Sequence, residues 1–197
     1  MAGVICNLKQ GTEEWLELRS KCFSASDAAA MLGLSKHTKR DELLFRKYTG
    51  IEKEYSSYAL NLFKNGHEAE FNARQIIEDM IDEELFAAVF KDGDLLASVD
   101  GITMDYSVAF EHKLFNLRLH DSVSKGSLPA EYMPQCQQIL ILTGAKKLIF
   151  VCSDGTEEKM AIMDIYPDEN YFQKIIDGWA DFKRDLDNYG NREINET

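Results

Sequence analysis

Three ionisable residues, Asp100, Glu111 and Lys113, fall within the stretch ASVDGITMDYSVAFEHKL (97–114), which otherwise has the pattern of two half-buried strands. Charged side chains are rarely tolerated on the inner part of a sheet unless they are paired or bind a metal. Glu111 and Lys113 stand two positions apart, so their side chains leave the same face of a strand. An antiparallel neighbour would bring Asp100 beside them. The stretch is therefore either a salt-bridged hairpin or a chemical site.

Two carboxylates and a lysine at one sheet edge suit metal-assisted cleavage of a phosphodiester. Mg²⁺ prefers oxygen ligands and keeps several waters, so Asp100, Glu111 and the main-chain carbonyl of His112 are candidate ligands of one ion. Glu70, on a helix upstream, is a candidate ligand of a second ion, and Mn²⁺ could replace Mg²⁺. The ions would generate hydroxide and stabilise the leaving oxygen. Lys113 would orient the attacking water or lower its pKa.

The Glu-x-Lys pattern at 111–113 is weak evidence when taken alone. The same pattern occurs at 157–159, in a predicted turn where a solvated charge pair is expected. A lone pattern of this kind is more often a salt bridge than a site, and an Asp-Gly step such as the one at Asp100 is more often a turn. Both interpretations stay open at this point.

The elements that must position these residues can be predicted from apolar periodicity and capping residues. Helices are expected over residues 12–21, 24–33, 39–50, 56–80, 129–144 and 168–189. Strands are expected over residues 85–90, 95–99, 106–114, 146–153 and 159–166. Thr12 is the expected N-cap of the first helix, and Ser24 with Asp27 forms a capping box in the second. This order predicts an α/β fold with a mixed central sheet flanked by helices.

The composition is that of a globular chain. Its 197 residues are 45% hydrophobic and 28% charged, with no linker-like stretch, which suits one compact domain. We divide it into N-terminal helices (1–55), a catalytic core (56–165), and a C-terminal helix and tail (166–197). No apolar run could span a bilayer and no signal-peptide pattern is present, so a cytoplasmic location without membrane contact is expected. The cysteines and histidines lack zinc spacing, which favours reduced thiols.

Charge is unevenly distributed along the chain. The net charge of −12 argues against a protein that coats nucleic acid passively. Residues 1–50 hold 8 Lys and Arg against 6 Asp and Glu, a balance of +2, whereas residues 51–197 hold 14 against 28, a balance of −14. The N-terminal quarter is therefore the expected contact for phosphate. Within it, the run Lys36–Arg40 is either a solvated loop or a contact with a DNA backbone.

Four short motifs follow one another at characteristic spacing. They are G-x-x-x-E at 66–70, S-V-D-G at 98–101, E-H-K at 111–113 and Y-M-P-Q-C-Q at 132–137. The segment WLELRSKCFSASDAAAMLG at 15–33 adds the pattern W-x-x-x-R-x-x-x-x-S-A-S. From about residue 11 to about residue 142, the chain resembles the phage lambda exonuclease and YqaJ-type viral recombinase nucleases. These form a branch of the PD-(D/E)xK superfamily, whose core is restriction-endonuclease-like.

The resemblance implies roles for eight side chains. The metal-binding acids would be Glu70, Asp100 and Glu111, with Lys113 as the catalytic lysine and Gln135 beside the metal site. The 5′-phosphate of the digested strand would be held by Arg19, Ser26 and Ser98. In departures from the family pattern, Val99 stands where a proline usually precedes the aspartate, and His112 is more polar than the usual middle residue. Glu68 is an extra acid that we expect at the surface.

The activity implied by the resemblance is Mg²⁺-dependent 5′-to-3′ digestion of one strand of double-stranded DNA. It further implies a processive, ring-shaped homotrimer and a protein partner that anneals the exposed single strand during recombination. Two alternatives remain: a site-specific endonuclease of the same superfamily, and a catalytically inactive DNA-binding module. The complete acid–acid–lysine set argues against the inactive module, because DNA binding alone does not require Lys113.

Overall fold

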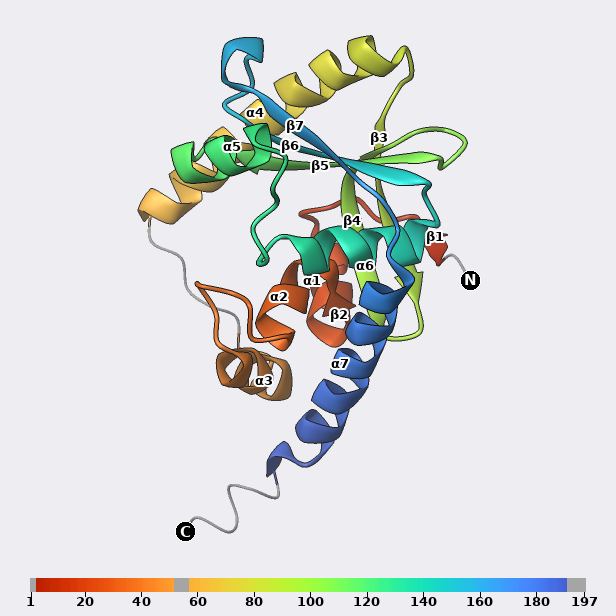
Figure 1. The fold of residues 1–197 in the computed structure, drawn as a ribbon. Helices are drawn as coiled ribbons and strands as arrows, with labels where there is room; N and C mark the ends of the chain where they lie inside the picture. Colours follow the sequence, from red (N-terminus) through yellow and green to blue (C-terminus); the bar gives the residue numbers. More distant parts are fainter. Residues whose placement is uncertain (1–2, 52–56, 191–197) are drawn as a thin grey trace.

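A computed structural model describes residues 3–51 and 57–190. Within these residues the chain forms a seven-stranded sheet in the order β1-β3-β4-β5-β6-β7, with β2 paired to β4 beside this path (Figure 1). The strands are β1 (Val4–Cys6), β2 (Phe23–Ser24), β3 (Phe86–Asp92), β4 (Leu95–Ile102), β5 (Val108–Leu114), β6 (Lys147–Ser153) and β7 (Ala161–Ile165). The β5–β6 and β2–β4 pairs are parallel and the others antiparallel. The predicted mixed sheet is confirmed.

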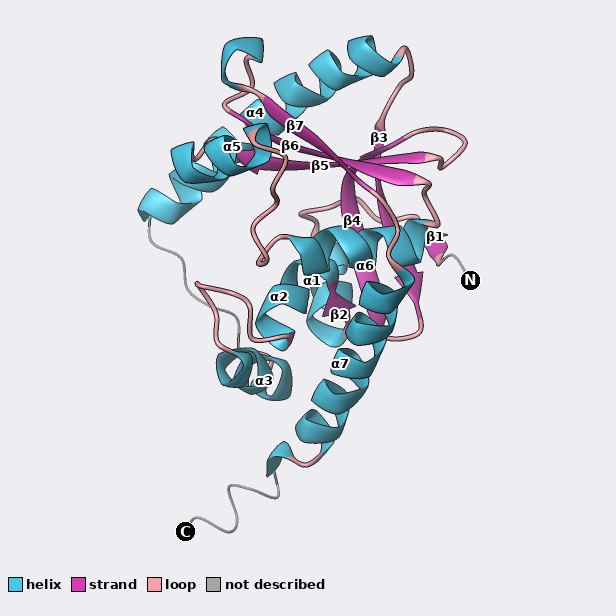
Figure 2. Cartoon of the chain, in the orientation of Figure 1, coloured by secondary structure: helices cyan, strands magenta, loops and turns pink. Residues whose placement is uncertain are grey.

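Helices pack around the sheet (Figure 2). They are α1 (Glu13–Lys21), α2 (Ala28–Met31), α3 (Arg40–Thr49), α4 (Ser57–Ile81), α5 (Leu117–Ser124), α6 (Met133–Thr143) and α7 (Glu169–Asp187), with 3₁₀ turns at Ala25–Asp27 and Glu157–Lys159. α4 packs on β5 and β6, α6 packs on β3 to β6, and α7 packs along α3 and α6. In the described part of the chain, no helix combines the length and apolar character needed to cross a membrane.

Alternate residues of β6 divide the hydrophobic core between two layers. Ile149 and Val151 pack in a cluster with Ile77 of α4. Phe150 packs in a separate cluster with Ile139 of α6. β6 is therefore buried on both faces, which explains why its sequence is an almost continuous apolar run.

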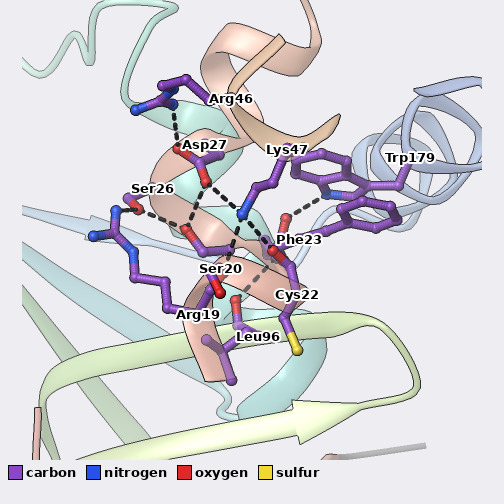
Figure 3. Close-up of polar contacts among 12 residues, drawn as sticks. Arg19, Ser20, Cys22, Phe23, Ser26, Asp27, Arg46, Lys47, Leu96 and Trp179 are labelled. Carbon is purple, nitrogen blue, oxygen red and sulfur yellow. Dashed lines mark hydrogen bonds and ion pairs between the residues drawn. The ribbon is translucent and has the colours of Figure 1, made fainter. Parts of the chain in front are cut away.

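One buried side chain, Gln138 of α6, joins the N-terminal segment to the sheet. Its amide nitrogen donates to the main-chain carbonyls of Phe23 at 2.8 Å and Leu96 at 3.2 Å. Its amide oxygen accepts from the indole N–H of Trp179 in α7 at 2.7 Å. The Phe23 and Trp179 rings stack with their centroids 4.7 Å apart (Figure 3). A fully paired buried amide of this kind fixes β2, β4, α6 and α7 relative to one another.

The segment 24–33 differs from the predicted helix. Ser24 pairs in parallel with Leu96 through β2, so the chain is still extended at this point and enters α2 only after a 3₁₀ turn. The Ser24 hydroxyl donates to the Asp27 carboxylate at 3.2 Å and caps no main-chain N–H. The predicted capping box was wrong, because pairing with a strand far away in the sequence overrides the local signal.

Other element boundaries lie close to the predicted ones. Thr12 caps α1 by accepting from the main-chain N–H of Trp15 at 3.4 Å. α6 begins later than predicted and has a proline in its first turn, where the missing N–H has no intrahelical partner to lose. Besides β2, two elements were not predicted: β1, which is too short to show periodicity, and α5, whose N-cap is Asn116. The expected helix start at residue 56 and the tail after residue 190 lie outside the described residues.

Gly178 of α7 lies against the end of α2. A Cβ at this position would lie 2.6 Å from Met31 Sδ and 2.9 Å from Leu32 Cδ2, and Met31 is buried. We predict that Gly178→Ala lowers the free energy of unfolding by about 1–3 kcal/mol, because overpacking outweighs a gain in helix propensity of about 1 kcal/mol. Urea denaturation followed by circular dichroism measures this change.

Gly66→Ala in α4 is the matched control, because nothing lies within 4 Å of the Cβ that it would add. This control should leave the free energy of unfolding unchanged or raise it by up to about 1 kcal/mol. A Gly178→Ala protein as stable as the wild type would mean that Met31 and Leu32 can move away from the added Cβ without lowering the free energy of unfolding.

Candidate active site

The strands β4 and β5 pair only at residues 101–102 with 109–110. Beyond this short ladder they diverge, and Figure 2 shows β4 running in a different direction from β5. Asp100 lies where the strands part. Its Oδ2 accepts a hydrogen bond from the main-chain N–H of His112 at 2.9 Å. A carboxylate thus takes the place of the main-chain carbonyl that a longer ladder would offer to β5.

Glu111 is the most buried acid of the site, with only 2% of its side chain exposed. Lys113 Nζ donates to Glu111 Oε1 at 2.7 Å and to Gln135 Oε1 at 3.0 Å. Gln135 Nε2 donates to the same Glu111 oxygen at 2.5 Å. The first turn of α6 therefore orients the two charged groups of β5. The sequence left a salt bridge and a chemical site as alternatives for this stretch. Glu111 and Lys113 do form a salt bridge, and the same two residues are candidates for the site.

Burial changes the proton affinity of both carboxylates. It raises the pKa of Asp100 to about 7, and the negative charge of Glu70 adds to the effect. It also raises the pKa of Glu111 to about 7, with the charge of Asp100 as the next cause. Burial alone would lower the pKa of Lys113, but the charges of Glu111 and Asp100 outweigh it and hold this pKa above its usual value. One lysine therefore does not neutralise the carboxylates that surround it.

These residues fit a hard divalent cation. Glu111 Oε2 is buried and has no hydrogen-bond partner among the described residues, so one carboxylate oxygen is open to a ligand. Asp100 and the main-chain carbonyl of His112 supply further oxygen donors. Within the described residues, no three His, Cys, Asp or Glu side chains form a group able to hold a metal, so waters would complete the coordination sphere. A second ion at Glu70 stays a prediction.

A cavity of about 410 Å³ opens beside these groups. All eight side chains expected from the sequence line it: Arg19, Ser26, Glu70, Ser98, Asp100, Glu111, Lys113 and Gln135. They come from α1, the 3₁₀ turn after β2, α4, β4, β5 and α6, so segments far apart in the sequence meet at one surface. The structure brings the expected residues together, and their roles stay predictions.

The N-terminal side of the cavity is rich in hydrogen-bond donors. Arg19 Nη2 donates to Ser26 Oγ at 3.1 Å, and Ser26 Oγ lies 2.8 Å from Ser24 Oγ (Figure 3). The Arg19 guanidinium lies 5.2 Å from the centre of the Trp15 ring, whose N–H donates to Ser98 Oγ at 2.8 Å. An arginine with several hydroxyl groups matches the geometry of a phosphate.

Lys47 of α3 holds this N-terminal segment in place. Its Nζ donates to the main-chain carbonyls of Cys22 at 2.6 Å and Arg19 at 3.0 Å, and lies 3.5 Å from the Asp27 carboxylate (Figure 3). Arg46 approaches the other oxygen of Asp27 at 3.4 Å. α3 thereby fixes the end of α1 from which Arg19 projects.

Sequence reasoning missed several residues at the site. Arg74 Nη1 donates to the main-chain carbonyl of Asp100 at 2.9 Å, and its position four residues after Glu70 on a helix was a usable signal. Trp15 is only 8% exposed, and it also lines the cavity. Gln10 lines the cavity from the turn before α1, where no sequence pattern marks it.

Other charged residues lie elsewhere. Glu68 is exposed and does not line the active-site cavity. In the run at 36–40, Lys36 pairs with Glu131 at 2.8 Å, and Arg40 pairs with Asp185 at 2.7 Å. A DNA contact by this run stays a prediction.

The surroundings of Lys159 and His112 add detail to what the sequence predicts. Lys159 pairs with Asp154 at 3.0 Å, so the exposed pair expected within 157–159 has a different acid. The ring of His112 lies with Nε2 3.0 Å from Ser153 Oγ, and burial lowers its pKa to about 4.

The family model of the YqaJ-like viral recombinase domain matches residues 14–146, which is 133 of the 197 residues. A search of curated proteins finds no match. The alkaline exonuclease LHK-Exo from Laribacter hongkongensis is similar in structure, with a TM-score of 0.75 at 22% identity, covering 94% of this chain and 99% of that one.

Two other solved structures are similar. LHK-Exo in complex with dAMP has a TM-score of 0.76 at 24% identity, over 94% of this chain and 99% of that one. A phage related exonuclease from Haemophilus somnus 129PT has a TM-score of 0.67 at 14% identity, over 87% of this chain and 96% of that one. At these identities the likeness establishes the fold alone, which is a mixed sheet flanked by helices.

The raised pKa of Asp100 predicts how stability depends on pH. Without divalent cations, the folded state binds more protons than the unfolded state between pH 3.8, the ordinary pKa of an aspartate, and about pH 7, its pKa in the fold. The free energy of unfolding contributed by Asp100 therefore falls as pH rises through this window and is constant above it. Asp100→Asn, which cannot titrate, should gain stability relative to the wild type over the same window.

Thermal unfolding of both proteins in EDTA from pH 4.5 to pH 8, which covers most of that window, measures the difference. Removing the Asp100 charge also lowers the pKa of Glu111, and this contribution has the same sign. Adding Mg²⁺ at pH 8 should raise the melting temperature of the wild type and leave that of Asp100→Asn almost unchanged. A stability difference that does not vary with pH would mean that Asp100 is ionised in the metal-free protein.

Proposed function

The chain belongs to the YqaJ-like viral recombinase domain family, and we propose that it is a metal-dependent exonuclease that digests one strand of double-stranded DNA from 5′-phosphorylated ends. Family membership supports a nuclease that acts on DNA. One observation carries the finer assignment: a single cavity is lined both by Arg19, Ser26 and Ser98 and by Asp100, Glu111 and Lys113. The first group suits a terminal phosphate, and the second suits the adjoining phosphodiester.

Asp100 and Glu111, with the carbonyl of His112, would hold Mg²⁺, for which Mn²⁺ could substitute. When bound, the ion supplies a water of lowered pKa and positive charge at the leaving oxygen. Lys113 stays protonated at neutral pH because its pKa is raised, so it acts as a hydrogen-bond donor and not as a base. It orients the attacking oxygen and stabilises the charge that develops on the phosphate. Gln135 holds the side chains of Lys113 and Glu111 in fixed positions through hydrogen bonds to both.

The arrangement supports 5′-to-3′ polarity. If the terminal 5′-phosphate binds at Arg19, the first phosphodiester reaches the acids. Attack of water on its phosphorus breaks the bond to the 3′-oxygen of the terminal nucleotide, which takes up a proton as it leaves. The shortened strand then carries a new 5′-phosphate. Each cycle therefore regenerates the end that the Arg19 side of the cavity recognises.

We extend the proposal to the assembly that the family resemblance implies. A homotrimeric ring around the duplex would place the less acidic N-terminal segments toward DNA and the acidic remainder outside, and topological enclosure would make digestion processive. The 3′ single strand left behind would pass to a single-strand annealing protein in the cytoplasm of a bacterial host. An endonuclease would use the same acids, and supercoiled circular DNA distinguishes it because an exonuclease leaves this substrate intact.

Asp100→Ala, Glu111→Ala and Lys113→Ala should each reduce the release of mononucleotides from linear duplex by at least about 100-fold, because each removes a metal ligand or the charge that stabilises the transition state. The assay uses 5′-phosphorylated duplex with Mg²⁺, and circular dichroism verifies folding. Glu157→Ala, which alters the other Glu-x-Lys pattern, is the control and should retain wild-type activity. Substantial cleavage by Lys113→Ala would remove the catalytic assignment of β5.

Arg19→Ala should lower the ratio of digestion rates on 5′-phosphorylated and 5′-hydroxyl ends by about 10-fold, because it removes a charged donor to the terminal phosphate. Competing duplexes that differ only at the 5′ end measure the ratio. Lys21→Ala is the matched control, since Lys21 is an exposed cation of the same helix and pairs with Glu17 at 2.6 Å. If both variants keep the wild-type ratio, Arg19 is an ordinary surface arginine.

A further inference from the structure

Besides a small hollow of about 20 Å³ beside Arg19, two larger cavities adjoin the active-site cavity, and each offers a path to DNA that continues past the cleaved bond. The first has a volume of about 240 Å³ and is called the Lys9 cavity; it shares Gln10, His67 and Glu70 with the active site and adds Lys9 and Arg74. The second has a volume of about 460 Å³ and is called the Glu68 cavity; it shares Leu114 and adds Glu68, Asp154 and Lys159.

The helix α4 separates the two cavities. Its residues in the Lys9 cavity are His67, Glu70 and Arg74, and those in the Glu68 cavity include Asn65, Glu68 and Asn72. Each member of the second set lies two positions before a member of the first. Residues two positions apart on an α-helix point in nearly opposite directions. A strand that leaves the active site along α4 therefore passes on one side of this helix or the other.

Charge distinguishes the two paths. The Lys9 cavity contains two permanent cations, Lys9 and Arg74, against the single acid Glu70. The Glu68 cavity contains Glu68 and Asp154, and its lysine is already paired with Asp154 at 3.0 Å. A phosphate would be attracted to the first cavity and repelled from the second.

Arg74 connects the Lys9 cavity with the catalytic acids. Its guanidinium donates to the main-chain carbonyl of Asp100 at 2.9 Å and lies 5.8 Å from the centre of the Phe71 ring. Because an arginine has five N–H donors, this single hydrogen bond leaves others for a ligand. Arg74 therefore stands between the cleavage site and any anion in the neighbouring cavity. Lys9 is exposed and extends the positive surface away from the acids.

We propose that the Lys9 cavity binds the phosphodiester immediately 3′ of the cleaved one, on the same DNA strand. This inference rests on the proposed function and adds a site to it: the terminal phosphate at Arg19, the cleaved phosphodiester at Asp100 and Glu111, and the following phosphodiester at Lys9 and Arg74. The strand thus turns past the β3 side of α4 and away from Glu68.

The test removes the charge either from the second DNA linkage or from Lys9. The substrate is a 5′-phosphorylated duplex whose second linkage is a neutral methylphosphonate, and single-turnover release of the first nucleotide gives a rate constant and a half-saturating concentration. For the wild type, the neutral linkage should raise the half-saturating concentration by about five-fold, with little change in the rate constant. Lys9→Gln should raise it similarly on unmodified duplex, and the neutral linkage should then add less than about two-fold.

The salt dependence provides a second readout that a structural role would not change. Lys9→Gln should lower the slope of the logarithm of affinity against the logarithm of salt concentration by about one, as expected for the loss of one phosphate contact. Lys159→Gln, in the Glu68 cavity, is the matched control and should retain both the wild-type affinity and the full response to the neutral linkage.

Two outcomes would overturn the proposal: a Lys9→Gln protein that still responds fully to the neutral linkage, or a Lys159→Gln protein whose response disappears. The second would assign the strand to the Glu68 cavity. Wild-type protein on unmodified duplex tests the proposed function separately, because failure to release any nucleotide there would reject the exonuclease and not merely the path of its strand.

Discussion

The divergence of β4 and β5 at Asp100 is the constraint from which the rest of the site follows. A strand that loses its neighbour has main-chain donors to satisfy, and the Asp100 carboxylate satisfies the N–H of His112. The divergence also leaves open the cavity that Arg19, Glu70 and Gln135 line from other elements. A continuous ladder would close this space, and an apolar residue at position 100 would leave the N–H unpaired. One side chain therefore stabilises the separated strands and is also a candidate oxygen ligand.

The same arrangement couples stability to function. Asp100 and Glu111 are both buried, and Lys113 is the cation that most strongly lowers the pKa of each. Burial, together with the negative charge of neighbouring carboxylates, nevertheless raises both pKa values, and a divalent cation would offset this excess of negative charge. The metal-free site is therefore a strained part of the fold that binding would stabilise. Catalytic centres often carry such a cost, because the charge needed for chemistry is unfavourable without its ligand.

Sequence reasoning succeeded where the signal was local and failed where it depended on distant partners. Strand periodicity and two-residue spacing put Glu111 and Lys113 on one face, and the structure joins them. The capping box at Ser24 failed because Leu96 pairs with that residue across the fold. Gln138 looked like an ordinary polar residue of a helix, since its three partners lie in β2, β4 and α7. The resemblance to a known family supplied what periodicity could not, namely that Arg19 and Asp100 belong to one site.

The helix α6 has a geometric consequence for the product. Gln135 binds Lys113 and Glu111, whereas Gln138, less than one turn further on, binds the carbonyl of Phe23 next to the segment that carries Ser26. A rigid span of one helix therefore sets the distance between the Ser26 segment and the acids of β5. Under the proposed function, this distance separates the bound 5′-phosphate from the phosphodiester that is cleaved. The length of the fragment released in each cycle is then independent of base identity, as an enzyme that must digest any sequence requires.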